Sequence, residues 1–272
     1  MFLASFGAGI LGSLVGIGGG LLITPILTLI FGVDIHLAIG ASIVSIIATS
    51  SGAAAAYVKD KITNLRVGMF LEIATTTGAI TGAAVAAYLN SSILFALFGI
   101  ILLLTVTPSI RRRSEELPVG VVNDSWAQQL KLGSTYHDAR MKADIPYQVT
   151  RTPVGFSVMY LAGLASGLLG IGGGTFKVLG MEGAMRLPMK VSTTTSNFMI
   201  GVTAAASAGI YLVRGDVNPF ITAPVMLGIL GGAMIGSKLL VRSTNVAIRR
   251  IFIIVLLFVA ADMILKAFGI LP

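Results

Sequence analysis

Two glycine clusters are the first residues in this sequence whose type and spacing could do chemistry. The run LVGIGGG at residues 14–20 recurs as LLGIGGG at residues 168–174, in both cases within an apolar stretch. Each glycine costs a helix about 1 kcal/mol relative to alanine, so we expect the chain to break at both places. Breaks inside a membrane expose backbone amides and the positive end of a helix dipole. Together they predict an anion site that includes Gly18, Gly19, Gly20, Gly172, Gly173 and Gly174.

Two other interpretations of the glycines are weaker. Small residues often serve only to let membrane helices pack closely, and this fits the glycines scattered through the rest of the chain better than the doubled cluster. A nucleotide-binding loop is disfavoured because neither cluster continues to Gly-Lys-Ser/Thr or follows a strand pattern.

Lys177 follows the second cluster directly, at the position where the first copy has Ile23. A charge near the bilayer centre costs at least about 2.5 to 3.5 kcal/mol on insertion scales and is by default functional. We therefore expect its ammonium group to bind the anion. The alternative is that this lysine snorkels to a nearby membrane interface.

A hydroxyl-rich run opens the next apolar segment, and its donors could bind an oxyanion without adding another charge. Hydrogen bonding between helices is the alternative role. If small gaps are allowed, Ser42 in the first half aligns with Thr194 in this run. The residues predicted to bind substrate here are Ser192, Thr193, Thr194, Thr195, Ser196 and Asn197, together with Ser42.

Glu72 and Asp262 are the carboxylates within apolar runs. A carboxyl group in a low-dielectric setting can titrate near neutral pH, so either residue could carry a proton as the coupling ion. Alternatively, each could lie near a membrane surface or pair with a lysine.

The composition requires a membrane setting for these residues. The chain of 272 residues is 55% hydrophobic and 11% charged, and its mean hydropathy is +0.93. These values exclude a water-soluble class and favour helices that satisfy their own backbone in lipid. Because there is no cysteine and the two histidines are far apart in sequence, we expect no metal, no cofactor and no thiolate chemistry. The net charge of +8 is spread between apolar runs, which indicates membrane topology and not nucleic-acid binding.

Eight apolar segments divide into two related halves, as in many secondary transporters. Residues 1–107 form a first transmembrane repeat, 108–152 a cytoplasmic loop, and 153–272 a second repeat. The predicted fold is therefore an all-α polytopic membrane protein with two repeats of four segments. The segments are at about 1–31, 36–58, 67–89, 92–107, 153–180, 188–213, 219–241 and 246–268.

Two topologies are compatible with these segments. If all eight cross the membrane, the repeats are parallel and the basic residues divide between both sides. If segments one and five are re-entrant, with the glycines at their tips, the repeats are inverted and nearly all basic residues lie on one side. The positive-inside rule favours the inverted arrangement, and both versions place the central loop in the cytoplasm.

The sequence resembles the TauE/SafE family of sulfite exporters and related small-anion permeases. The resemblance rests on the glycine motifs at residues 11–25 and 165–178 and on PMKVSTTTSN at residues 188–197. It implies transport of sulfite, thiosulfate or small organosulfonates, with the glycine clusters and the hydroxyl-rich helix starts as the site. One departure is Leu179, where a proline often follows in the family and where the first copy has Pro25.

The predicted function is a secondary transporter in the cell membrane that moves a small anion by alternating access around a midplane site. An anion channel of the same architecture is the main alternative. An intramembrane enzyme is less favoured, because no histidine–acid pair or nucleophile constellation lies on neighbouring segments.

Overall fold

The computed structural model describes residues 1–15, 20–59, 62–111, 120–138, 143–240 and 245–270 of the chain. Within these ranges the chain is mostly helical. In order, the elements are α1 (Phe2–Val15), α2 (Gly20–Pro25), the π-helical turn η1 (Ile26–Ile30), α3 (Ile35–Lys59), α4 (Leu65–Ala86), α5 (Ser91–Arg111), α6 (Ser125–Gln129), β1 (Ser134–Asp138), β2 (Ala143–Tyr147), α7 (Thr152–Leu169), α8 (Gly174–Leu179), η2 (Gly180–Ala184), α9 (Met189–Val213), α10 (Pro219–Leu240) and α11 (Asn245–Ala267).

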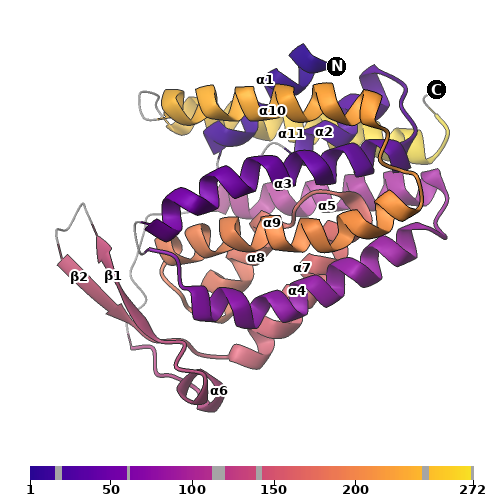
Figure 1. Cartoon of the computed structure of the whole chain (residues 1–272). Helices are drawn as coiled ribbons and strands as arrows, with labels where there is room; N and C mark the ends of the chain where they lie inside the picture. Colours follow the sequence, from indigo (N-terminus) through magenta and orange to yellow (C-terminus); the bar gives the residue numbers. More distant parts are fainter. Residues whose placement is uncertain (16–19, 60–61, 112–119, 139–142, 241–244, 271–272) are drawn as a thin grey trace.

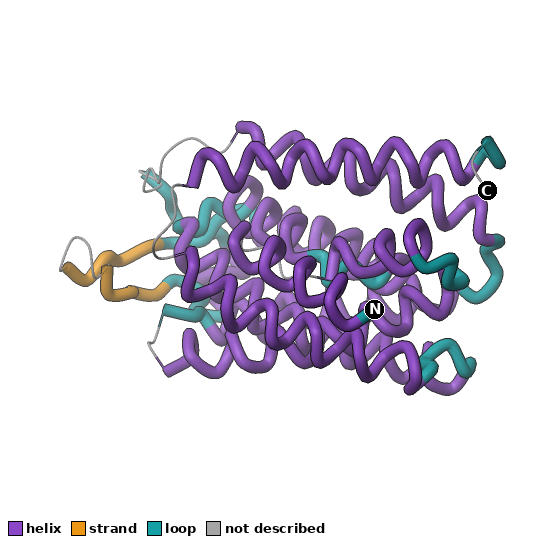
Figure 2. The backbone as a smooth tube through the Cα atoms, turned by 90° about the horizontal axis from the view of Figure 1, so that it is seen from above, coloured by secondary structure: helices purple, strands orange, loops and turns teal. Residues whose placement is uncertain are grey.

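The long helices lie side by side in a bundle, and the β1–β2 hairpin and α6 project from one end of it (Figures 1 and 2). We call this the loop end and the opposite one the far end. Among the described residues, four helices are long and apolar enough to cross a membrane, and several shorter apolar helices accompany them. The expectation of a helical membrane protein is confirmed at this level. The four are Leu65–Ala86, Thr152–Leu169, Met189–Val213 and Pro219–Gly236.

The two halves have elements at the same spacing. Adding 154 to the bounds of α2, η1 and α3 gives those of α8, η2 and α9. No gap is needed, so Ser42 corresponds to Ser196. The alignment of Ser42 with Thr194 was wrong, because the gaps it allowed shifted the helix by two residues.

The halves are interleaved, because the first long helix of each packs along the third long helix of the other. Helix α7 packs along α4, and α1 packs along α10. Glycines bring these backbones into contact: a Cβ on Gly163 would lie 2.1 Å from Thr75 O, and one on Gly9 would lie 2.5 Å from Ile229 O. Both pairs occupy equivalent positions in the two halves, so the close packing of small residues is itself repeated.

The central loop is a small folded unit at the loop end. Its β1 and β2 pair antiparallel. Asp124 caps α6 by accepting a hydrogen bond from Ala127 N (2.7 Å), and it also accepts one from Thr152 N (2.6 Å) at the start of α7. Partial burial disfavours the charged carboxylate, but these hydrogen bonds outweigh it and hold the pKa of Asp124 below its usual value. The loop is thus fastened to the bundle.

Candidate functional site

The second glycine cluster forms a sharp turn between α7 and α8. Gly170, Gly172 and Gly173 have φ angles of +65°, +72° and +62°. Residues with a Cβ rarely adopt these angles, so glycine is what permits the chain to reverse here. The predicted break in segment five is therefore present at the glycines.

After the turn, α8 and η2 run back along α7. Gly173 lies beside Ala162, because an added Cβ would be 2.9 Å from Ala162 O. Gly180 lies against Met159, because an added Cβ would be 3.0 Å from Met159 Cε. At the base, Thr150 N donates to Met185 O over 3.2 Å. The chain from α7 to η2 is thus a helical hairpin that returns to the loop end with its glycines at the tip.

A buried serine connects the two glycine regions. The Ser42 hydroxyl lies 3.0 Å from Gly20 O, at the start of α2, and 2.7 Å from Gly170 O at the tip of the second hairpin. The equivalent Ser196 donates to Gly174 O over 3.2 Å. Both serines therefore hold the backbone of the glycine turns. The predicted site residues Gly18 and Gly19 lie outside the described residues.

Lys177 is fully buried beside the second turn, so the snorkelling alternative is wrong. Its ammonium donates to Thr203 Oγ1 over 2.5 Å. The Thr203 hydroxyl in turn donates to Glu72 Oε1 over 2.7 Å, and Thr76 donates to the same oxygen over 3.0 Å. A threonine on α9 thus connects a lysine of one half to a carboxylate of the other.

Several polar atoms around this cluster retain hydrogen-bonding capacity. Within the described part of the chain, Glu72 Oε2 and Thr175 Oγ1 are buried and have no hydrogen-bond partner. Buried polar atoms are normally satisfied, so each exception calls for an explanation, and a bound ion or water is one. Thr175 precedes Lys177 by two residues on α8, so the two side chains point to different sides of that helix.

The rest of the hydroxyl-rich run has varied surroundings. Thr194 donates to carbonyls of its own helix, including Lys190 O at 3.0 Å. Thr195 accepts from Asn64 N at 3.1 Å, where α4 begins. Ser192 is buried with no hydrogen-bond partner among the described residues. Thr193 and Asn197 are half-buried. Of this run, Ser196 is the residue that the structure brings to a glycine turn.

The two carboxylates predicted to carry protons lie in different surroundings. Glu72 is in the cluster with Lys177, whereas Asp262 is half-buried on α11, which packs mainly on α5 and α1. Among the described residues there is no group of three His, Cys, Asp or Glu residues that could hold a metal ion.

Thr203 is the central site residue that the sequence interpretation missed. It lies in the middle of an apolar helix with no local signal. One signal was available, because Thr49 occupies the equivalent position 154 residues earlier.

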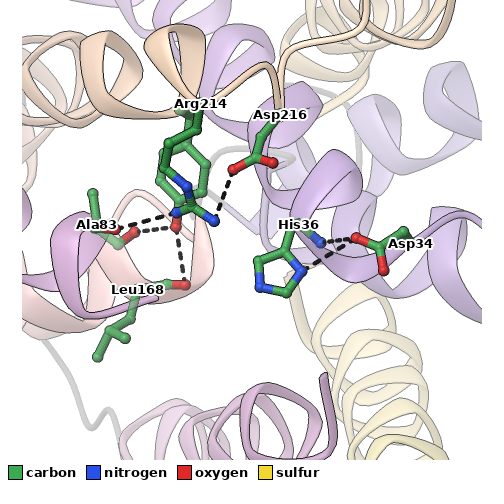
Figure 3. A network of polar contacts seen from close by, with 8 residues as sticks. Asp34, His36, Ala83, Leu168, Arg214 and Asp216 are labelled. Atoms are coloured by element: carbon green, nitrogen blue, oxygen red, sulfur yellow. Dashed lines mark hydrogen bonds and ion pairs between the residues drawn. The ribbon is translucent and has the colours of Figure 1, made fainter. Parts of the chain in front are cut away.

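A polar network at the far end holds the last turn of α7 (Figure 3). The buried Tyr211 hydroxyl donates to Gly167 O over 2.8 Å. Arg214 lies over the Tyr211 ring, 5.4 Å from its centroid, and pairs with Asp216 at 3.0 Å. These contacts fix the chain just before the glycine turn, and they explain why both tyrosine and arginine are found where α9 ends.

Comparisons with known proteins agree on one family. The model of the family described as "Sulfite exporter TauE/SafE" matches residues 1–263. The probable membrane transporter protein YunE of Bacillus subtilis (strain 168) is 28% identical over 265 residues, covering 94% of this chain and 93% of that protein. YdhB of the same organism, also a probable membrane transporter protein, is 26% identical over 239 residues, 88% of each chain. A probable membrane transporter protein of Xylella fastidiosa is 25% identical over 270 residues, with 98% and 93% covered. No solved structure gave a significant match.

Proposed function

The chain belongs to the sulfite exporter TauE/SafE family, and from this premise we propose that it carries a small sulfur oxyanion across the cell membrane. Membership of the family makes it an integral membrane transporter. The proposed substrates are sulfite, thiosulfate or a sulfonate, moved by alternating access of the two halves around the glycine turns.

The observation that carries this proposal is the fully buried Lys177 at the second glycine turn. A lone buried charge is expensive, and a lysine kept at this depth needs an anionic partner. Its partner in this structure is reached through Thr203. An oxyanion that binds Lys177 directly would replace that indirect contact with a direct ion pair between the ammonium group and the anion.

The proposed site combines this ammonium with neutral donors. The backbone amides at Gly172, Gly173 and Gly174, at the start of α8, supply hydrogen bonds without a second positive charge. Gly18, Gly19 and Gly20 would supply the equivalent amides of the first turn. Ser42 and Ser196 would act by holding the turns in place, while the hydroxyls of Ser192 to Asn197 remain candidate contacts along the path.

We place the two hairpins in the membrane as inverted re-entrant segments. Helix α7 runs beside α4, which starts at the loop end, and α1 runs beside α10, which starts at the far end (Figure 1). The basic residues support a cytoplasmic loop end through the positive-inside rule. The basic residues at the loop end include Arg66, Lys131, Arg151, Arg186 and Lys190. Those at the far end include Arg214 and Lys266.

The proposal is tested by the thermal stability of the purified protein with sulfite, thiosulfate, sulfate, sulfoacetate, taurine and phosphate. A ligand of the native state raises the midpoint of unfolding by mass action. We expect one or more sulfur oxyanions to raise it, and Lys177→Ala to abolish the increase. Lys266→Ala is the matched control, because this lysine lies elsewhere in the bundle beside Thr28 O and the Phe95 ring. If no sulfur oxyanion stabilises the native protein, or if Lys177→Ala responds like the native protein, the proposal is wrong.

A further inference from the structure

Glu72 is joined to the proposed anion site by one hydroxyl group, and its two carboxylate oxygens are unequal. Oε1 accepts hydrogen bonds from Thr203 (2.7 Å) and Thr76 (3.0 Å). Oε2 is buried and has no hydrogen-bond partner among the described residues. A proton could therefore bind at Oε2 without breaking a hydrogen bond, and it would do so one hydroxyl away from Lys177.

We propose that Glu72 is the proton-binding site of the transporter, and that its carboxylate and the transported anion take turns as the counter-ion of Lys177. The inference rests on the proposed function and adds its coupling ion. When the anion is absent, ionised Glu72 balances the lysine through Thr203. When the anion binds Lys177, Glu72 takes up one proton at Oε2, and both leave together on the other side.

Charge balance is the physical reason for this coupling. With Glu72 ionised, the buried lysine and carboxylate sum to zero. An arriving oxyanion would add at least one negative charge to a buried site, where unbalanced charge is strongly unfavourable. Protonation of Glu72 removes one negative charge and leaves the lysine free to pair with the anion. Binding of the anion and of the proton should therefore be mutually favourable.

The neighbours of Glu72 supply no competing charge. Helix α4 packs on α7 and α9. Tyr160 of α7 contacts Thr81, more than two turns along α4 from Glu72. The charged residues of α9, Lys190 and Arg214, lie at its two ends, roughly 15 to 20 Å along the helix from Thr203 at 1.5 Å per residue. Among the described residues, Lys177 is the group whose charge acts on Glu72.

The test measures anion binding at several pH values in the native protein and in Glu72→Gln. The probes are thiosulfate and sulfoacetate, whose own charge hardly changes near neutral pH. Linkage to one proton predicts that the affinity of the native protein rises by up to about tenfold for each pH unit of acidification. Glutamine resembles the protonated acid but cannot titrate, so Glu72→Gln should bind the anion with little dependence on pH.

Two further variants separate titration from folding. Glu72→Asp keeps a carboxyl group and should keep the pH dependence even if it binds more weakly. Asp262→Asn is the matched control, because it neutralises the other carboxylate of an apolar helix away from this cluster, and it should behave like the native protein.

The outcomes are distinguishable. If Glu72→Gln binds the anion with the same pH dependence as the native protein, or if Asp262→Asn loses that dependence, the inference is overturned while the proposed function stands. If neither probe nor any other sulfur oxyanion binds the native protein at any pH, the proposed function itself has failed. In reconstituted vesicles, anion uptake by the native protein should acidify the interior, and uptake by Glu72→Gln should not.

Discussion

The segments that follow the two glycine clusters share a backbone plan but differ in chemistry. In the second half, Lys177 and Thr203 meet Glu72. At positions offset by 154, the corresponding residues are Ile23, Thr49 and Met226. Ile23 is buried in an apolar cluster, and the Thr49 hydroxyl donates to carbonyls of its own helix. The region around Ile23, Thr49 and Met226 therefore has the scaffold of the site without its charges.

This difference shows which features build the fold and which could bind an anion. Both halves have the glycine clusters, and both have a serine that holds a glycine carbonyl. These features belong to the scaffold. The lysine and the carboxylate occur once, so we expect one charged binding site at the meeting point of the hairpins instead of two equivalent ones.

The largest effect should come from giving the second hairpin the residue of the first. Lys177→Ile removes one partner of a buried charge pair and leaves Glu72 without a counter-ion, which typically costs about 3–5 kcal/mol of stability. The double variant Lys177→Ile/Glu72→Met copies the two residues at the equivalent positions, Ile23 and Met226, and should recover most of that loss. Thermal unfolding of the three proteins in detergent measures this. Equal midpoints for the single and double variants would contradict the charge pairing.

The next effect concerns the packing of α7 on α4 and of α1 on α10. Gly163→Ala and Gly9→Ala each place a methyl group against the backbone of the partner helix. Both should destabilise the protein by a similar amount, about 1–3 kcal/mol, as overpacked sites do. Gly7→Ala is the control, because an added Cβ there meets nothing within 4 Å. A large difference between the Gly163 and Gly9 variants would break the equivalence of the two interfaces.

The glycine turn itself should be sensitive to a Cβ. Gly173→Ala puts alanine at φ +62° with its Cβ 2.9 Å from Ala162 O. We expect a cost of about 1–2 kcal/mol from the left-handed backbone, together with weaker anion binding. Gly209→Ala, where nothing lies within 4 Å of the added Cβ, should be neutral or slightly stabilising. Unfolding midpoints with and without anion test both, and a neutral Gly173→Ala would show that the turn can relax.

The smallest effect should come from the central loop, which has no counterpart in the first half. Asp124→Ala removes the cap of α6 and should cost about 1 kcal/mol locally, with anion binding unchanged. Because the pKa of Asp124 is lowered in the folded state, its contribution is complete above the unfolded pKa and is lost as pH falls through the folded pKa. Hydrogen exchange at residues 123–130 measures this. If the exchange protection of these amides in the native protein does not fall on acidification, Asp124 does not stabilise this segment as a charged cap.

The sequence was sufficient for local features and insufficient for contacts between halves. The break at Gly172 and Gly173 follows from glycine propensity, and the prediction that Lys177 binds the anion follows from the cost of a charge in lipid. The connection from Lys177 through Thr203 to Glu72 could not be predicted, because it joins three helices distant in sequence. The same holds for the packing of α1 on α10. The alignment of Ser42 failed because similar hydroxyl residues fill neighbouring positions, and the 154-residue spacing decides between them.

The most direct test of the charged second hairpin is uptake of a radiolabelled sulfur oxyanion by vesicles containing the native protein or the double variant Lys177→Ile/Glu72→Met. We predict saturable uptake by the native protein and none by the double variant, even though the variant remains folded. Saturable uptake of native size by the double variant would show that the lysine and the carboxylate are not part of the transport site.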